Sequence, residues 1–190
     1  MTDTLLYRLA AIAGLAGGTL TLLAVARRAG LLPANALTHA LAPPAAALLL
    51  FTLTALYLVQ RHAAGRLGLA GFSLHHLGLS GLFAIEFLTH AVLRFHDPAV
   101  LTAPGRPYFL AVALTFLTGV LLFGAASWRA AVLPRAPLAL YVTGLSAAAL
   151  RGSVPEWVYL GGLLLGSAGV LWLSVTLPRT AARRPAVALR

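Results

Sequence analysis

The sequence predicts an all-α fold, a polytopic transmembrane bundle of six helices. Composition is the first reason, because 60% of the 190 residues are hydrophobic, the mean hydropathy is +0.90 and only 9% are charged. A soluble domain carries roughly a quarter charged residues, and a chain of 19.8 kDa cannot bury this much apolar surface inside itself. The second reason is that the sequence lacks the alternating ten-residue segments from which transmembrane β-barrels are built.

Six apolar segments are long enough to cross ~30 Å of hydrocarbon, which takes about 20 helical residues. They are residues 5–26, 37–59, 67–93, 108–127, 130–150 and 158–177. The fifth is long enough only if it begins at Ala130 and carries Pro134 and Arg135 in its first turns, which is acceptable because proline is tolerated near a helix start. Residues 1–178 then form one transmembrane domain, and residues 179–190 form a short basic cytoplasmic tail.

The basic residues indicate how the chain sits in its membrane. The net charge of +10 comes from fourteen arginines and four acidic residues, and the arginines are spread between the apolar segments. This spread is typical of contacts with lipid head groups, whereas a nucleic-acid partner would need one basic face. Nine arginines fall on the side of the two termini and five on the other side, so the positive-inside rule predicts cytoplasmic termini. In the tail, Arg179, Arg183 and Arg184 are expected to contact anionic lipid.

The sequence contains a weak internal repeat. Residues 18–33 match residues 119–134 at seven of sixteen positions. The match would be explained by a 3+3 inverted repeat, a known construction of secondary transporters. It would equally be explained by the likeness of helix ends in a chain rich in alanine and leucine. In addition, Gly14-x-x-x-Gly18 and Gly162-x-x-x-Gly166 have the spacing that lets membrane helices pack closely.

The third predicted span differs from the others because it contains four ionisable residues: Glu86, His75, His76 and His90. At about 100° per residue, His75, Glu86 and His90 fall within an arc of roughly 60°, and His76 lies about 80° from Glu86. Ionisable groups within a membrane usually face the bundle interior and find a partner there. We therefore treat these four residues as the candidate intramembrane polar site.

Three interpretations of this site remain open. It is a polar cluster that packs the bundle, a site that senses or transports protons or a small solute, or part of a metal or b-type haem site. The haem alternative uses His39 and His90, which begin the second span and end the third, and therefore lie in the same leaflet. The absence of cysteine excludes thiolate ligands, and no hydrolase or nucleotide-binding motif is found. We therefore expect no enzymatic activity and no cofactor, and the alternative is haem b or a metal ion held by His39 and His90.

A family resemblance can be stated on three stretches of the chain. They are Gly65–Phe72 at the entry to the third span, Gly119–Arg135 at the exit from the fourth, and the glycine-rich last span. Together they resemble uncharacterised six-span membrane proteins of actinobacteria and similar high-GC bacteria. The resemblance implies a multi-pass protein of the bacterial cytoplasmic membrane and no particular activity. It also marks Glu86 as a feature of the family, whereas the pair His75-His76 looks particular to this chain. A homo-oligomer or a partner membrane subunit is compatible with this class.

Overall fold

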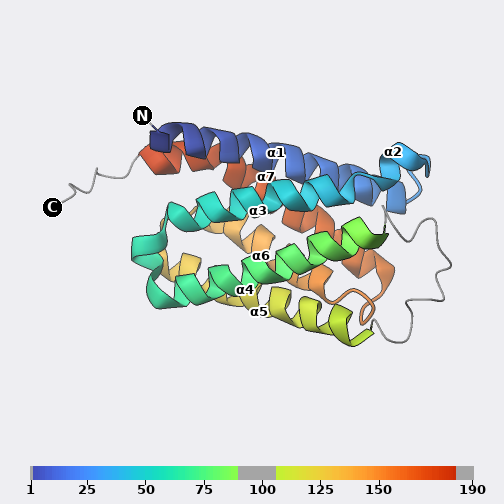
Figure 1. Ribbon diagram of the computed structural model, residues 1–190. Coiled ribbons are helices and arrows are strands. Elements are labelled where there is room, and N and C mark those ends of the chain that lie inside the picture. The colour runs from blue at the N-terminus through green and yellow to red at the C-terminus, as the bar shows by residue number, and fades with distance from the viewer. Residues whose placement is uncertain (1, 90–105, 183–190) are drawn as a thin grey trace.

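The computed structural model describes residues 2–89 and 106–182, and these form a bundle of helices without a β-strand (Figure 1). The helices are α1 (Thr2–Arg28), α2 (Ala36–His39), α3 (Ala42–Leu58), α4 (Arg61–Phe87), α5 (Arg106–Ala130), α6 (Arg135–Ala149) and α7 (Glu156–Ala182). All of them except the four-residue α2 run along the bundle. The predicted all-α bundle of six long helices is therefore confirmed for the described part of the chain.

Five segments of the described residues are long and apolar enough to cross a membrane. They are Leu5–Arg28, Ala36–Leu58, Arg61–Phe87, Pro107–Ala130 and Glu156–Ala182. The exception is α6, whose 15 residues extend about 22 Å at 1.5 Å per residue, less than the ~30 Å of hydrocarbon.

The outer faces of the helices expose large apolar side chains. Ile12 on α1, Leu77 on α4, Leu114 on α5 and Trp172 on α7 are each at least half exposed. A soluble protein rarely exposes apolar surface of this extent on several sides, whereas lipid chains match it. The outer surface therefore supports a membrane-embedded protein.

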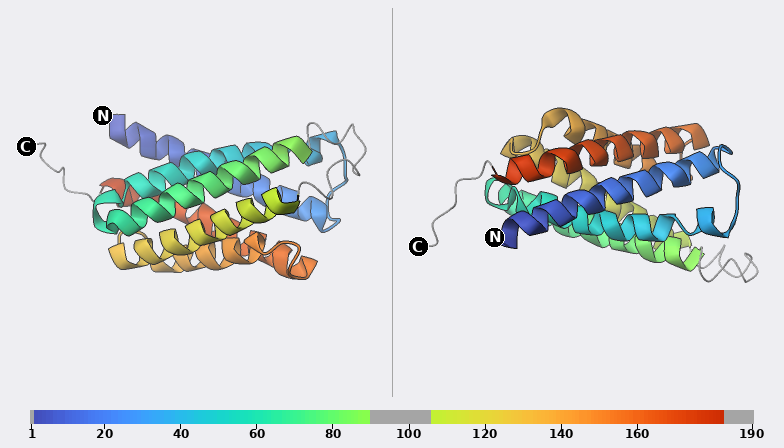
Figure 2. Two further views of the ribbon diagram at one scale, coloured as in Figure 1. Left: turned by 60° about the horizontal axis from the view of Figure 1, so that its bottom comes forward. Right: turned by 90° about the horizontal axis from the view of Figure 1, so that it is seen from above.

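The six long helices follow one another around a closed ring. Each packs against the next along the chain, and α7 returns to pack against α1. Because neighbours are antiparallel, α1 begins and α7 ends at one end of the bundle, which we call the terminal end (Figures 1 and 2). At the opposite end, α1, α4 and α6 finish, and α3, α5 and α7 begin.

This ring order bears on the inverted repeat. In such a repeat, α1, α3 and α4 would correspond to α5, α6 and α7, whose unit begins at the opposite end of the bundle. Viewed from the terminal end, successive helices follow one another around the ring in one direction; viewed from the opposite end, they follow in the other direction. Each three-helix unit, viewed from the end at which it begins, therefore turns in the direction opposite to the other unit. The two units have opposite handedness, and no rotation superimposes them. The sequence match between residues 18–33 and 119–134 is consequently a likeness of two helix ends.

The fifth predicted span begins later than the sequence indicates. Helix α5 continues to Ala130, and Ala131 then takes φ 52°, a left-handed conformation that ends the helix. Pro134 is extended, with φ −60° and ψ 132°, and precedes the first residue of α6, Arg135. The helix predicted over residues 130–150 therefore covers only 135–149.

Three other boundaries differ from the prediction. The second span, predicted over 37–59, is divided into α2 and α3, and α3 has proline in its first turn, where a missing N–H costs little. The third begins at Arg61 and is kinked at Gly65, which has φ 59°. The last continues through Pro178 to Ala182, beyond the predicted end at residue 177.

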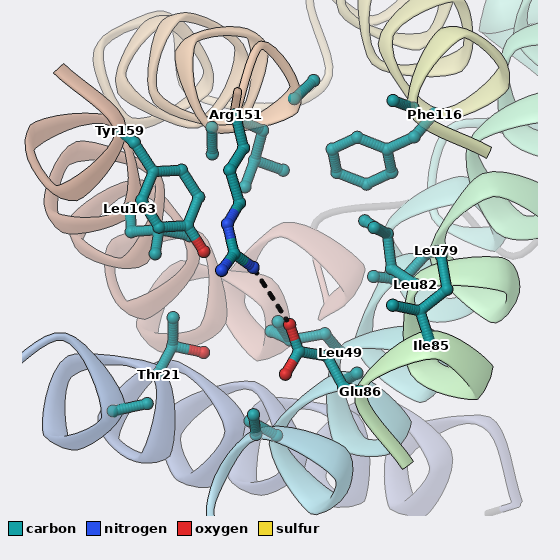
Figure 3. A pocket seen from close by; sticks show the side chains of 18 of the residues that line it. Thr21, Leu49, Leu79, Leu82, Ile85, Glu86, Phe116, Arg151, Tyr159 and Leu163 are labelled. Carbon is teal, nitrogen blue, oxygen red and sulfur yellow. Dashed lines mark ion pairs between the residues drawn. The ribbon is translucent and has the colours of Figure 1, made fainter. Parts of the chain in front are cut away.

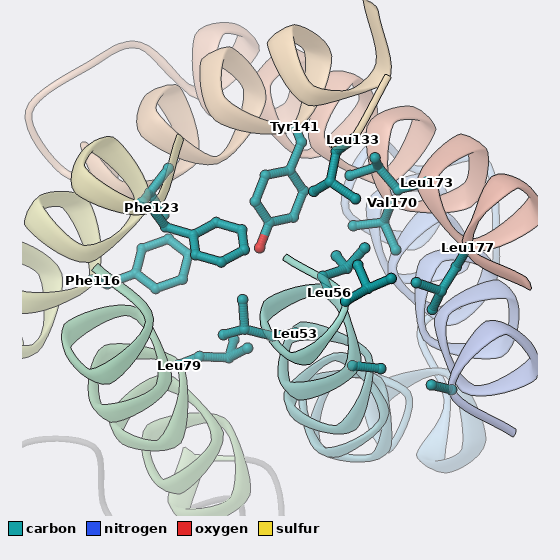
Figure 4. Packing of buried hydrophobic residues seen from close by; sticks show 14 residues of the cluster. Leu53, Leu56, Leu79, Phe116, Phe123, Leu133, Tyr141, Val170, Leu173 and Leu177 are labelled. Atoms are coloured by element: carbon teal, nitrogen blue, oxygen red, sulfur yellow. The ribbon is translucent and has the colours of Figure 1, made fainter. Parts of the chain in front are cut away.

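Glycines form two close seams between helices. Gly71 and Gly78 of α4 face the α5 backbone at Phe123 and Phe116, and Gly119 of α5 faces the backbone of His75. In the second seam, Gly144 of α6 faces Gly162 and Gly166 of α7. The packing role predicted for Gly162-x-x-x-Gly166 is confirmed. Between the seams lies the apolar core, to which α3, α4, α5, α6 and α7 all contribute (Figure 4).

The α4/α5 seam predicts that glycine-to-alanine substitutions at two positions affect stability differently. In Gly119→Ala, the new methyl group would meet the His75 backbone, and overpacking of this kind costs about 1–3 kcal/mol. Gly161→Ala on α7 is the matched control, because its methyl group would enter open space. We expect the first variant to unfold at a lower temperature than the wild type in detergent, and the second at the same or a higher temperature. Equal melting of the two variants would contradict the seam.

Candidate functional site

A chamber of about 580 Å³ is lined by residues from the helix ends that lie opposite the termini, and Figure 3 shows it from close by. All six long helices contribute to its wall. Most of the lining side chains are alanine, leucine, isoleucine and phenylalanine, and small alanines on α1, α3, α5 and α6 leave the space open. The volume lies within the range of pockets that bind small organic molecules.

Three charged side chains enter this apolar chamber from two helices and one loop. Glu86 comes from the last turn of α4, Arg28 from the end of α1, and Arg151 from the loop after α6. Glu86 Oε1 lies 3.9 Å from Arg28 Nη2 and 3.9 Å from Arg151 Nη1. Figure 3 shows the Glu86 and Arg151 side chains pointing toward each other across the chamber. These contacts form because α1, α4 and α6 all end at the same end of the bundle.

The ring of Tyr159 lies beside both arginines. The guanidinium carbons of Arg28 and Arg151 lie 5.4 Å and 5.1 Å from the centroid of the Tyr159 ring, distances at which a cation is attracted to an aromatic face. Arg28 and Glu86 are largely buried, whereas the Arg151 side chain is 53% exposed. We call Glu86, Arg28, Arg151 and Tyr159 the charged cluster. Two guanidinium groups and one carboxylate give it a surplus of one positive charge.

His75 lies about 16 Å from Glu86 along the helix axis, since eleven residues separate the two. It is fully buried, and its Nε2 is 3.2 Å from the Tyr141 hydroxyl. Phe116 and Phe123 approach the imidazole edge to face, with centroids 5.2 Å and 5.8 Å away. The second ring nitrogen, Nδ1, has no hydrogen-bond partner among the described residues. His75 and Glu86 both face the ring interior, but they belong to separate sites.

A thin apolar wall separates His75 from the chamber. A second cavity of about 30 Å³ is lined by His75, Tyr141 and Thr52. Four residues line both this cavity and the chamber: Leu49, Leu79, Phe116 and Leu145. The polar pair is therefore adjacent to the chamber without opening into it.

The other predicted site residues are placed as follows. His76 is partly buried, and its ring lies 5.5 Å from that of Phe72, away from the charged cluster. His39 Nδ1 lies 3.3 Å from Arg27 Nη1. His90 lies outside the described residues, so the haem or metal pair of His39 and His90 stays a prediction. Among residues 2–89 and 106–182, no three histidine, cysteine or acidic side chains gather as a metal site would require.

The remaining sequence-predicted residues belong to the basic tail. Arg179 is exposed near the end of α7, and Arg183 and Arg184 lie outside the described part of the chain. The expected contact of this segment with anionic lipid therefore stays a prediction.

Sequence reasoning missed Arg28, Arg151 and Tyr159 as site residues. The alternation of spans and loops in the sequence places Arg28 and Arg151 on the side of the membrane opposite the termini, and Glu86 lies near the end of its predicted span on that side. This shared side is the signal that groups the three residues. Contact with lipid head groups explains the arginines equally well, because a sequence does not reveal which helices are neighbours.

Comparison with protein-family models, curated proteins and solved structures finds no match to this chain. The resemblance to six-span proteins of high-GC bacteria therefore stays a prediction, and the site is interpreted from its geometry.

The buried His75–Tyr141 pair predicts a cost for removing one hydroxyl. Tyr141→Phe would leave His75 Nε2 buried without its partner, and an unsatisfied buried polar atom costs about 1–3 kcal/mol. Tyr108→Phe is the matched control, because Tyr108 is exposed. We expect Tyr141→Phe alone to lower the midpoint of unfolding in detergent. If the two variants are equally stable, the hydrogen bond contributes nothing to the fold.

Proposed function

We propose that this chain is a multi-pass protein of the bacterial cytoplasmic membrane that binds a small solute in the chamber, without catalysing its conversion. Binding serves the sensing or transport of that solute. The observation that carries the proposal is the chamber itself, an apolar space of about 580 Å³ into which three charged side chains project. Buried charge of this kind is costly in a membrane protein and marks solute pathways and binding sites.

The arrangement of the charged cluster supports binding over packing alone. A packing cluster would be expected to fill the space around its charges. Here the ion pairs of Glu86 with Arg28 and Arg151 border an open volume. The His75–Tyr141 pair, in contrast, is enclosed by aromatic rings and suits a packing role.

The proposal includes an orientation. With both termini in the cytoplasm, the chamber would face the outer side of the membrane, because it lies at the end of the bundle opposite the termini. The solute would then be taken from outside the cytoplasm.

Filling the chamber with a side chain tests the proposed binding. Ala113 on α5 lines the chamber, and Ala111 on the same helix is exposed on the outer surface. We expect Ala113→Phe to abolish stabilisation by solutes, and Ala111→Phe to retain it, because only the former occupies the chamber. The measurement is the thermal midpoint of the full chain in nanodiscs, with a panel of anionic, cationic and neutral small solutes. A ligand at 100 times its Kd stabilises the folded state by about 2.7 kcal/mol. If no class of solute distinguishes the two variants, the proposed function is wrong.

The absence of cysteine from the sequence makes the orientation directly testable. Ser153 lies in the loop near the chamber and Ala182 ends α7 at the terminal end, and both are exposed. We expect a membrane-impermeant maleimide to label Ser153→Cys in intact cells and to label Ala182→Cys only after the cells are opened. The reverse pattern would invert the proposed orientation.

A further inference from the structure

The charges and walls of the chamber suggest what kind of solute it takes. We propose that the solute is an amphipathic anion, with a carboxylate or phosphate monoester head on an apolar chain. The head would lie between Arg28 and Arg151, and the chain would extend along the apolar wall. This inference rests on the proposed function and specifies the ligand of the same site.

The two guanidinium groups offer several donors to an anion. Both guanidinium carbons lie over the Tyr159 ring, and each guanidinium carries five N–H donors in the plane of the group. Glu86 Oε1 is 3.9 Å from each, whereas charge-assisted hydrogen bonds measure about 2.7–2.9 Å. A carboxylate or phosphate placed between the two arginines could accept hydrogen bonds from both at that shorter distance.

The rest of the chamber suits an apolar chain. From Glu86, the wall of α4 continues through Leu82 to Leu79, a length of about 10 Å for seven residues. At the far end, Leu49 and Phe116 close the space, and Ala45 and Ala46 on α3 keep it wide. This wall offers few hydrogen-bonding groups to a polar solute, so a sugar or amino acid would leave its own polar groups unpaired.

Other classes of solute fit the chamber less well. The surplus positive charge repels a cation. A neutral apolar molecule fits the walls but brings no negative charge to the two guanidinium groups, which share the single carboxylate of Glu86. Inorganic phosphate satisfies the arginines but leaves the apolar space unfilled. Only a molecule with both parts matches the charged cluster and the wall together.

The test measures binding of radiolabelled decanoate to the full chain in nanodiscs of phosphatidylcholine. Decyl phosphate, decanol, decylamine and inorganic phosphate serve as competitors. The decanoate that remains bound to nanodiscs of the Ala113→Phe variant is subtracted as background. In this variant the chamber is filled, so the remaining decanoate is the part dissolved in the lipid. We expect decanoate and decyl phosphate to bind at least tenfold more tightly than decanol, and decylamine and inorganic phosphate to compete weakly.

Three substitutions test the role of the charges. Arg151→Gln removes one donor, and because a hydrogen bond to a charged group contributes about 1.5–3 kcal/mol, we expect decanoate affinity to fall about tenfold or more. Glu86→Gln removes the carboxylate that competes for the arginines, so decanoate should bind more tightly. Arg66→Gln replaces an exposed arginine near the start of α4, away from the chamber; it changes the net charge equally and should have no effect.

The outcomes separate this inference from the proposed function. If decanol binds the chamber as tightly as decanoate, the anion is wrong and the proposed function stands. If Glu86→Gln weakens decanoate binding as Arg151→Gln does, recognition by surplus positive charge is wrong. If no probe distinguishes Ala113→Phe from Ala111→Phe, both proposals fail. Replacing part of the phosphatidylcholine with phosphatidylglycerol tests whether the natural anion is a lipid or a free solute. If phosphatidylglycerol competes with decanoate, the occupant of the chamber is an anionic membrane lipid.

Discussion

The contact of α1 with α7 closes the ring, and the chamber depends on this closure. In lipid there is little hydrophobic drive between helices, so association depends on close packing and on small residues. Gly14 of α1 allows close approach to Ser174 of α7 and Thr52 of α3, and the Thr52 hydroxyl donates to the carbonyl of Ala10 at 3.2 Å. An open row of the same helices would place α1 and α7 at opposite edges. Arg28 could then not reach the Tyr159 ring.

The shortness of α6 explains why a loop residue enters the chamber. Helix α6 has 15 residues, whereas its neighbours α5 and α7 have 25 and 27. The glycine seam at Gly144 holds α6 closely against α7, so the short helix stays within the bundle wall. Arg151 and Gly152, which follow α6, then line the chamber where a longer helix would have continued. A buried arginine within a span would be costly, but at this loop the side chain remains half exposed.

Hydropathy predicted the six helices, because length and apolar content are properties of each segment alone. The predicted boundaries were wrong where local backbone conformation decides them, as at Ala131 and at the kink of Gly65. Helical periodicity placed His75 and Glu86 on one face of the helix, and the structure agrees. Periodicity could not show that Arg28 and Arg151 pair with Glu86, or that Tyr141 pairs with His75. Those partners come from other parts of the chain. Which helices lie next to each other depends on the packing of all six, so it cannot be predicted from one segment alone. The role of the His39 and His90 pair stays a prediction, because His90 lies outside the residues that the structure describes.

The two polar sites of α4 illustrate how burial separates a structural group from a binding group. His75 is enclosed by Phe116, Phe123 and Tyr141, so its hydrogen bond ties α4 to α6 and its ring contacts tie α4 to α5. The cavity of about 30 Å³ beside this pair is too small for an organic solute, and a buried polar pair of this kind helps to specify one packing arrangement. Glu86 lies three turns further along, where the helices enclose space and its arginine partners stand at 3.9 Å. Charges held apart beside an open volume can exchange one partner for a ligand. That difference in geometry, on one helix face, is why we place binding at Glu86 and packing at His75.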